Sequence, residues 1–455
     1  MKKVFFWILI LPLVVHAQIN ADSLFIKKIS DEVLSNGKAY NLLYQLTKQV
    51  GGRLAGSPQF AKAIDWGKNS MQLMGADTVY LQQCMLPHWV RGKGDKVQII
   101  ALNDKKVTMP LDALALGNSF GDGKTITAEV IAISNFAELE KKKNEVKGKV
   151  VFFNYPFNPT YIIPGRAYGE SGIYRYSGPS RAAKYGAVAV VIRSLTEATD
   201  NNPHTGSLHY DSAYPKIPAA ALGLQDADAL WNYCQSSKVK IAITTHGRQL
   251  PDTIGYNVIG ELKGSEFSDE FITVGGHLDS WDVNEGAHDD GAGVVHTLEV
   301  LRTLKAIGYH PKHTIRFVLF ANEENGLRGG EKYAEIAKAK NEKHVFALES
   351  DEGGFTPRGF GFSVTAVQYQ KIVQWQPLLK PYGACDFELG GGGADIGPLA
   401  SYFKIPMAGL NPDNQRYFDI HHARSDVFES VNKRELLLGA INMAALIYLI
   451  DKNGI

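Results

Sequence analysis

The alternation of strand and helix patterns in residues 252–455 constrains the fold of this chain most strongly. Short apolar runs rich in Val, Ile and Phe have the character of buried strands, and longer stretches between them place apolar residues at helical spacing. The predicted strands are residues 271–274, 314–320, 345–348 and 405–410, and the predicted helices are residues 291–307 and 435–449. Alternation of this kind is typical of an α/β fold in which helices flank a mainly parallel sheet.

Polar side chains follow three of these predicted strands at the point where each strand ends. His277 follows the first strand, Glu323 and Glu324 follow the second, and Asp351 follows the third. Sites in open α/β sheets form at the carboxyl ends of the strands, so residues far apart in sequence can meet there. We therefore expect these side chains to share one crevice.

The residue types in this set suit zinc. Neutral imidazole nitrogen and carboxylate oxygen are ligands that zinc prefers. The candidate metal ligands are His277, Asp289, Glu324, Asp351 and His422. Asp289 could bridge two metals because a carboxylate has two oxygens, while Glu324 and Asp351 would each complete one metal. Glu323, beside a ligand but outside the set, would be free to act as the general base toward a metal-activated water.

Five motifs in this order resemble those of the co-catalytic zinc exopeptidases, the family of zinc aminopeptidases and glutamate carboxypeptidases. They are Gly-Gly-His-Leu-Asp-Ser-Trp at 275–281, Asp-Asp-Gly at 289–291, Asn-Glu-Glu-Asn-Gly at 322–326, Glu-Ser-Asp at 349–351 and the late His-x3-Asp at 422–426. The resemblance is to the plasma glutamate carboxypeptidase subgroup in particular. It covers most of the chain, including the turn Gly-Gly-Arg-Leu-Ala-Gly-Ser-Pro at 51–58.

The resemblance implies roles for individual residues. It implies two zinc ions (Zn2+) per chain on the five candidate ligands, with Asp289 as the bridge and Glu323 as the general base. Asp279 matches the acid that orients His277 without touching the metal. A cis peptide bond between Asp289 and Asp290 is also implied.

Two positions depart from the family pattern or match it only loosely. His421 stands where many aminopeptidases of the family have a tyrosine, so it could donate to the oxyanion or be structural, and it is also a competing candidate for the metal-binding histidine. Asp395 lies in a glycine-rich segment and could contact a substrate amino group or stabilise its own loop.

Residues 117–247 differ in sequence pattern from the rest of the chain. Short β-rich runs alternate there with loops rich in Gly, Pro and Tyr. We predict an inserted, β-rich domain at 117–247 that resembles a protease-associated domain. The expected catalytic domain then has an N-terminal part at 18–116 and a C-terminal part at 248–455, which carries the zinc site.

The N-terminus predicts export. Residues 1–17 combine two lysines, an apolar run too short to span a bilayer and a small-residue cleavage site at Ala17, as a signal peptide does. No later segment is apolar enough to be an integral membrane span. With 48 Lys and Arg against 47 Asp and Glu, the chain has no electrostatic basis for binding nucleic acid. Its three cysteines allow at most one disulfide, and whether they pair is open.

The function that follows is that of an exported two-zinc exopeptidase acting on dipeptides or short peptides. The sequence leaves open whether the enzyme acts as an aminopeptidase or as a dipeptidase or carboxypeptidase, which side chains it prefers, and whether it forms a homodimer. Two alternatives use the same fold: an acyltransferase like the glutaminyl cyclases, and a binding protein without catalysis. The complete set of ligands and base disfavours both.

Overall fold

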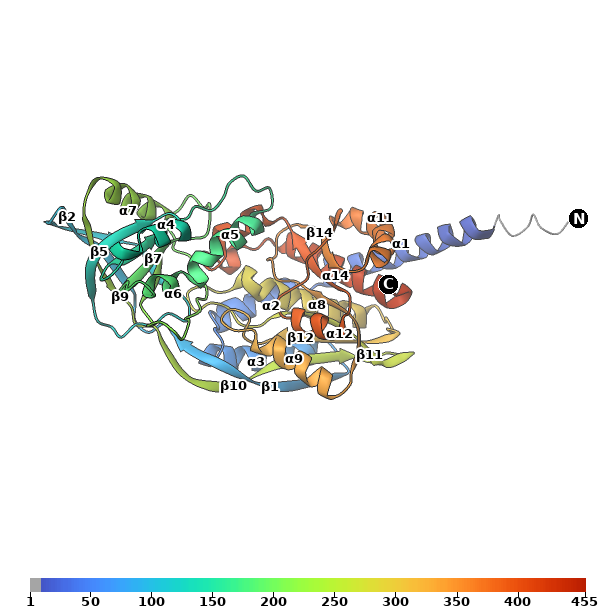
Figure 1. Cartoon of the computed structure of the whole chain (residues 1–455). Coiled ribbons are helices and arrows are strands. Elements are labelled where there is room, and N and C mark those ends of the chain that lie inside the picture. Colours follow the sequence, from blue (N-terminus) through green and yellow to red (C-terminus); the bar gives the residue numbers. More distant parts are fainter. Residues whose placement is uncertain (1–9) are drawn as a thin grey trace, which may run out of the picture.

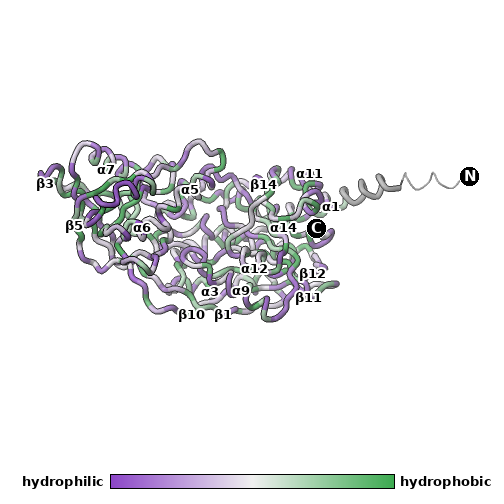
Figure 2. The backbone as a smooth tube through the Cα atoms, viewed as in Figure 1, coloured by the Kyte–Doolittle hydropathy of each residue, from purple (hydrophilic) through white to green (hydrophobic). Residues whose placement is uncertain are grey.

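The computed structural model describes the backbone of residues 10–455 and the side chains of residues 21–455. Two eight-stranded sheets form two parts of the molecule, side by side in Figure 1, with α1 (Ile10–Asn36) and the C-terminus on the same part. Figure 2 shows hydrophobic stretches in both parts, and each part has buried apolar clusters of its own.

The first sheet carries the predicted strands of residues 252–455. Its strand order is β1-β10-β12-β11-β13-β16-β14-β15. The strands are β1 (Thr78–Val90), β10 (Arg248–Leu262), β11 (Phe267–His277), β12 (His313–Phe320), β13 (Lys343–Glu349), β14 (Pro357–Ser363), β15 (Asp386–Leu389) and β16 (Met407–Pro412). The four central strands β12, β11, β13 and β16 are parallel. β10 runs antiparallel to β1 and β12, and β14 runs antiparallel to β16 but parallel to β15. The sheet is therefore mixed: four of its pairings are parallel, in keeping with the prediction, and three are antiparallel.

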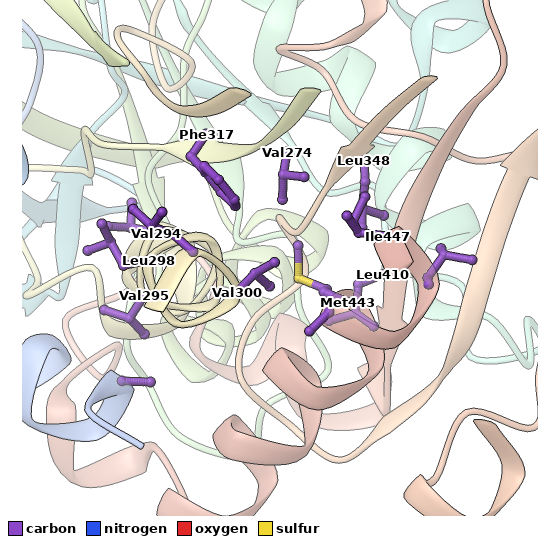
Figure 3. Packing of buried hydrophobic residues seen from close by; sticks show 14 of the residues in the cluster. Val274, Val294, Val295, Leu298, Val300, Phe317, Leu348, Leu410, Met443 and Ile447 are labelled. Carbon is purple, nitrogen blue, oxygen red and sulfur yellow. The ribbon is translucent and has the colours of Figure 1, made fainter. Parts of the chain in front are cut away.

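Helices cover both faces of this sheet because its central strands are apolar on both sides. Phe317 and Leu319 of β12 pack in one core cluster, and Val318 and Phe320 pack in another on the opposite face. The first face is covered by α1 (Ile10–Asn36), α2 (Ala39–Tyr44), α3 (Pro58–Leu73), α8 (Ala292–Ala306) and α14 (Lys433–Asn453), and the second by α9 (Arg328–Ala339) and α12 (Gly397–Phe403). Figure 3 shows Phe317, Val274 and Leu348 of the sheet facing side chains of α8 and α14.

The second sheet consists entirely of strands between β1 and β10. Its order is β3-β2-β9-β5-β6-β7-β8-β4, with β5 to β8 parallel. The strands are β2 (Lys96–Leu102), β3 (Lys105–Leu111), β4 (Ala113–Ala115), β5 (Ile126–Ile133), β6 (Val150–Phe153), β7 (Ala189–Arg193), β8 (Ala219–Leu222) and β9 (Val239–Thr244). Four helices accompany them: α4 (Phe136–Lys141), α5 (Pro164–Tyr176), α6 (Gly178–Ala183) and α7 (Leu224–Ser236).

The start of this second sheet differs from the expected boundary at residue 117. Strands β2, β3 and β4 precede that residue, yet β2 pairs with β3 and β9, and β4 pairs with β8. The chain leaves the first sheet after β1 and returns to it in β10, which pairs with β1 along most of its length. Local sequence pattern does not reveal this, because β2 and β3 form an ordinary hairpin that either sheet could accept.

Most of the predicted signal peptide, residues 1–17, lies outside the described residues, and its side chains lie outside them entirely. Within the described part of the chain, no helix is both long enough and apolar enough to cross a membrane.

Candidate metal centre and active site

The carboxyl ends of three adjacent parallel strands bring the predicted residues together. His277 ends β11, Glu323 and Glu324 follow β12, and Asp351 follows β13. Asp289 lies just before α8, and His422 follows the short helix α13 (Tyr417–Ile420). The predicted crevice is therefore present, and it collects residues from five separate segments.

The carboxylate of Asp289 lies at the centre of this cluster. Its Oδ1 is 3.2 Å from Nε2 of His277, and its Oδ2 is 3.2 Å from Nε2 of His422. His277 Nε2 is also 3.1 Å from Oδ1 of Asp351, and His422 Nε2 is 3.1 Å from Oε2 of Glu324. The five predicted ligands thus divide into two groups that share one carboxylate, each with one histidine and one further acid.

These spacings fit zinc. Ligand atoms about 2.0–2.1 Å from a tetrahedral zinc ion lie roughly 3.3 Å from one another, close to the distances in both groups. Oδ2 of Asp289 and Oε2 of Glu324 are buried and accept no hydrogen bond from the described residues. Nδ1 of His277 donates to the main-chain oxygen of Asp279 at 3.0 Å, so in the neutral ring Nε2 faces two carboxylates with its lone pair. A cation at its centre would satisfy such a cluster.

The carboxylates crowded into the site also favour a bound cation. Burial, and then neighbouring carboxylates, raise the pKa of Glu324 well above its ordinary value and raise that of Asp351. Burial opposes protonation of His277, but Asp351, Asp279 and Asp289 outweigh it and raise its pKa well above the usual range. Bound divalent cations would relieve this repulsion and keep the acids ionised.

His421 and His422 both approach Asp289, but their surroundings differ. Their rings stack with centroids 3.6 Å apart, and Nε2 of His421 is 3.3 Å from Oδ2 of Asp289. Only His422 also meets Glu324. Burial and the neighbouring His422 hold the pKa of His421 well below its usual range, so His421 is a neutral imidazole. This geometry favours His422 as the ligand.

Glu323 lines the cavity without a side-chain partner among the described residues. Its main-chain N–H donates to Oδ1 of Asp279 at 3.1 Å. Burial, and the carboxylates of Asp351 and Asp289 against the opposing effect of His277, raise the pKa of Glu323 to about 8. It is thus a half-buried carboxyl beside the candidate ligands that can hold or release a proton.

The carboxylate of Asp279 was expected to orient His277, but it contacts other groups. Its carboxylate is 3.7 Å from Nδ1 of His277, too far for a hydrogen bond, and it is the main-chain carbonyl that accepts from the ring. The carboxylate instead accepts the main-chain N–H groups of Glu323 and Glu324 at 3.1 and 3.3 Å. One residue therefore orients His277 through its backbone and both glutamates through its side chain.

Asp290 and Asp395 are two further buried acids near the centre, and Asp290 has a carboxylate oxygen within 4.8 Å of ligand atoms of His277 and Asp351. The peptide bond between Asp289 and Asp290 is cis, as the family resemblance implied. Both oxygens of Asp290 accept main-chain N–H groups, from His277 and Gly293. Asp395 is fully buried beside Glu349 and is not among the residues that line the cavity, so its contact with a substrate amino group stays a prediction.

Two buried residues to which the sequence analysis assigned no role hold the loop that carries Asp289. Asp426 accepts the main-chain N–H groups of Ala287, His288 and Asp289. Arg53, in the turn at 51–58, donates to the main-chain oxygens of Leu278, Glu285 and Gly286. Their motifs are visible in the sequence, but the contacts join segments more than a hundred residues apart.

A cavity of about 470 Å³ opens onto the candidate metal centre. Its walls come from both parts of the molecule. The first part contributes Asp289, Glu323, Glu324, Asp351, Glu352, Asn414, Tyr417, Phe418, His421 and His422, and the second contributes Ile163, Gly165, Tyr168, Arg175 and Ser207. None of the residues in the second group was predicted as a site residue, because they form no motif.

Comparison with known proteins places this chain among peptidases, as the residues of the candidate site suggest. The family model for peptidase family M28 matches residues 257–447. Carboxypeptidase Q of Mus musculus is 33% identical over 415 residues, which cover 91% of this chain and 85% of the mouse protein. The chain belongs to peptidase family M28. Its similarity to carboxypeptidase Q confirms the subgroup resemblance stated above.

Two solved structures are also similar to this chain in fold. A peptidase M28 precursor from Shewanella amazonensis has a TM-score of 0.90 at 30% identity, covering 96% of this chain and 98% of that one. A zinc aminopeptidase from Bacillus subtilis has a TM-score of 0.66 at 20% identity, covering 90% and 94%. This chain is therefore an M28 peptidase, a hydrolase, and it shares its fold with that zinc aminopeptidase.

Proposed function

We propose that this M28 peptidase is an exported two-zinc exopeptidase that hydrolyses dipeptides or short peptides. The observation that carries the proposal is the carboxylate of Asp289, whose two oxygens face two separate groups of ligands. One zinc ion would be held by His277, Asp289 and Asp351, and the other by His422, Asp289 and Glu324. Zinc ions bound there would supply a water nucleophile at neutral pH and polarise the scissile carbonyl.

The remaining residues of the site fit the proton transfers and the positioning that this reaction needs. Glu323 has a free carboxyl beside both ligand groups, so we assign it as the general base. Asp279 fixes the backbone of Glu323, which limits how far that carboxyl can move. His421 is neutral and lines the cavity, so it can donate a hydrogen bond to the oxyanion of the tetrahedral intermediate.

Residues 117–247 are proposed to act as a separate, protease-associated-like domain that covers this site. The support is the cavity wall, which includes Tyr168, Arg175 and Ser207 from that segment. A cavity of about 470 Å³ is of the size that holds small ligands. Export through the predicted signal peptide at 1–17 remains part of the proposal.

The deciding experiment compares zinc content and peptide hydrolysis in the full chain and in Glu323→Gln. Removal of a general base typically lowers the rate by about 10²–10⁴-fold. We expect Glu323→Gln to keep two zinc ions per chain and the wild-type fold, and to lose turnover of dipeptides by that amount. Glu331→Gln, an exposed change on α9, is the matched control and should behave as wild type.

Three results would contradict parts of this proposal. Near-normal turnover in zinc-loaded Glu323→Gln would remove Glu323 from the role of base. One zinc per chain under saturating metal would contradict the two-metal site. A zinc-loaded wild-type protein that cyclises N-terminal glutamine but cleaves no peptide would favour the acyltransferase alternative.

A further inference from the structure

Arg91 is a buried cation at the point where the chain leaves the first sheet. It follows the last residue of β1, and only 9% of it is exposed. Its Nε and Nη2 donate to Oδ2 and Oδ1 of Asp282 at 2.8 and 2.7 Å, which makes a two-point ion pair. Its Nη1 donates to the main-chain oxygen of Ala115, and Nη2 donates weakly to the hydroxyl of Thr205 at 3.5 Å. Arg91 therefore joins a loop of the first part to two segments of the second part.

The ion pair with Asp282 leads to the candidate ligand Glu324. Asp282 follows Trp281, whose main-chain N–H donates to Oε1 of Glu324 at 3.0 Å. The other oxygen, Oε2, is the one that lies 3.1 Å from Nε2 of His422. The indole of Trp281 is fully buried, and its ring centroid lies 5.7 Å from that of His422. Trp281 thus contacts both Glu324 and His422, and Arg91 holds the residue next to it.

The contact with Thr205 leads to His422 by a second route. Thr205 is fully buried, and its hydroxyl donates to the main-chain oxygen of Ala115 at 2.9 Å, the oxygen that Arg91 also uses. The main-chain N–H of Thr205 donates to the main-chain oxygen of His422 at 3.0 Å. The guanidinium of Arg91 therefore helps to fix the segment that holds the backbone of His422.

The indole of Trp281 also packs on the second part. Gly117 lies so close to it that an added Cβ would come within 1.8 Å of Cη2 of the ring. The ring of Trp89 meets the indole edge to face with centroids 6.5 Å apart, and the guanidinium carbon of Arg91 lies 5.0 Å from the centroid of Trp89. Movement of the second part would therefore disturb the packing of Trp281.

The other candidate zinc group lacks contacts of this kind among the described residues. The main-chain N–H of His277 donates to Asp290, and its ring donates to the main-chain oxygen of Asp279. The main-chain oxygen of Asp351 accepts weakly from the hydroxyl of Tyr417 at 3.5 Å. All of these residues belong to the first part. The two groups therefore differ in what holds them, although they share one carboxylate.

We propose that Arg91 is a positioning residue for the zinc site of His422, Asp289 and Glu324, and that this site depends on the contact between the two parts of the molecule. The inference rests on the proposed function, because it requires two zinc ions. The zinc site of His277 does not depend on that contact. Closure of the cavity by the second part and completion of the two-metal centre are thereby linked.

The size of the effect follows from the distance between Arg91 and the ligands. An arginine fork that holds a carboxylate at two points fixes its orientation, which a single contact does not. Changing a residue that holds a metal ligand typically weakens metal binding by about 10- to 100-fold. Arg91 acts through one further residue, so we expect the lower end of that range, about 10-fold.

The test measures the two zinc affinities of the full chain by competition with a chromophoric chelator. Arg91→Gln is the variant. Arg248→Gln is the matched control, because Arg248 is exposed and pairs with Val90 across the same junction of β1 and β10. We expect Arg91→Gln to weaken one of the two zinc sites by about 10-fold and to leave the other unchanged. Arg248→Gln should bind both zinc ions as the wild type does.

Two further backgrounds identify the site that is weakened. Asp351→Ala removes a ligand from the His277 site only, and Glu324→Ala removes one from the His422 site only. Adding Arg91→Gln to Asp351→Ala should weaken the remaining zinc by about 10-fold. Adding it to Glu324→Ala should leave the remaining zinc unchanged.

The outcomes separate this inference from the proposed function. Equal weakening of both sites in Arg91→Gln would show a general structural role and overturn the inference. No change in either site, or a change confined to the site of His277, would also overturn it, and in each case the two-zinc exopeptidase would stand. A wild-type protein that binds one zinc ion under saturating metal would instead contradict the proposed function.

If Arg91→Gln does not fold, Asp282→Asn tests the same ion pair from its other side. It keeps the shape of the side chain and removes the charge, so it should weaken the same zinc site and not the other. Arg91→Lys keeps the charge but not the planar fork. Its zinc affinity at that site should lie between those of the wild type and Arg91→Gln, and unchanged affinities in both Asp282→Asn and Arg91→Lys would overturn the inference.

Discussion

At the scale of single residues, Asp289 is the side chain on which both candidate zinc ions depend. It is the one member of the cluster that contacts both His277 and His422, whereas Asp351 contacts only His277. Asp289 would therefore be a ligand of both zinc ions, and Asp351 a ligand of only one. Their removal should have different effects on metal content.

We predict that Asp289→Ala loses both zinc ions and that Asp351→Ala keeps about one per chain. The physical reason is that the first change removes an anionic ligand from both sites and the second from only one. Zinc per folded chain, measured by elemental analysis after dialysis, is the readout, with circular dichroism as the check on folding. Loss of one zinc from Asp289→Ala, or of both from Asp351→Ala, would contradict the bridging role.

At the scale of elements, the loop between β11 and α8 is held by residues from both ends of the chain. Asp426 accepts three of its main-chain N–H groups, and Arg53 donates to three main-chain oxygens at or next to it. The loop contains Asp289, so its conformation sets the position of the shared carboxylate. Buried main-chain groups without partners are unfavourable, and the two side chains satisfy them here.

We predict that Asp426→Ala lowers the free energy of unfolding by about 3–5 kcal/mol, because buried N–H groups lose a charged acceptor. It should also weaken zinc binding, although Asp426 contacts only the main chain of Asp289 and no ligand side chain. Asp426→Asn keeps one acceptor oxygen and should lower stability by only about 1–2 kcal/mol. Urea unfolding and zinc titration of both variants measure these effects. Equal losses in the two variants would show that the acceptor is not the reason.

At the scale of the whole molecule, two sheets enclose one cavity. The candidate ligands and Glu323 belong to the part built on the first sheet, and the opposite wall comes from residues between β1 and β10. The second part is anchored beside the metal centre, since the main-chain N–H of Thr205 donates to the main-chain oxygen of His422 at 3.0 Å. A substrate must fit between the two parts to reach Glu323.

This arrangement predicts a steep dependence on substrate size. Dipeptides and tripeptides should be cleaved efficiently, longer peptides more slowly, and a folded protein not at all, because a folded chain cannot enter a cavity of about 470 Å³. Mass spectrometry of the products from matched peptides and from a folded protein is the measurement. Efficient internal cleavage of the folded protein would contradict both the restricted access and the exopeptidase assignment.

The sequence by itself determined the residues that meet at the crevice and the parallel centre of the first sheet. Both depend on short-range signals: apolar runs mark the strands, and His277, Glu323 and Asp351 stand directly after them. Parallel neighbours have their carboxyl ends on one edge, so this local pattern is enough to place those side chains together. The same signals left β1, β10 and β14 unassigned, and with them the antiparallel pairings of the sheet.

Only the tertiary structure decided how the site is supported and what closes it. The carboxylate of Asp279 was expected at His277, but it holds the backbone of Glu323 and Glu324, and Asp395 is buried away from the cavity. Arg175 carries no motif, and only the fold places it in the cavity wall. Contacts of this kind depend on which distant segments pack together, and local sequence pattern contains no information about that packing.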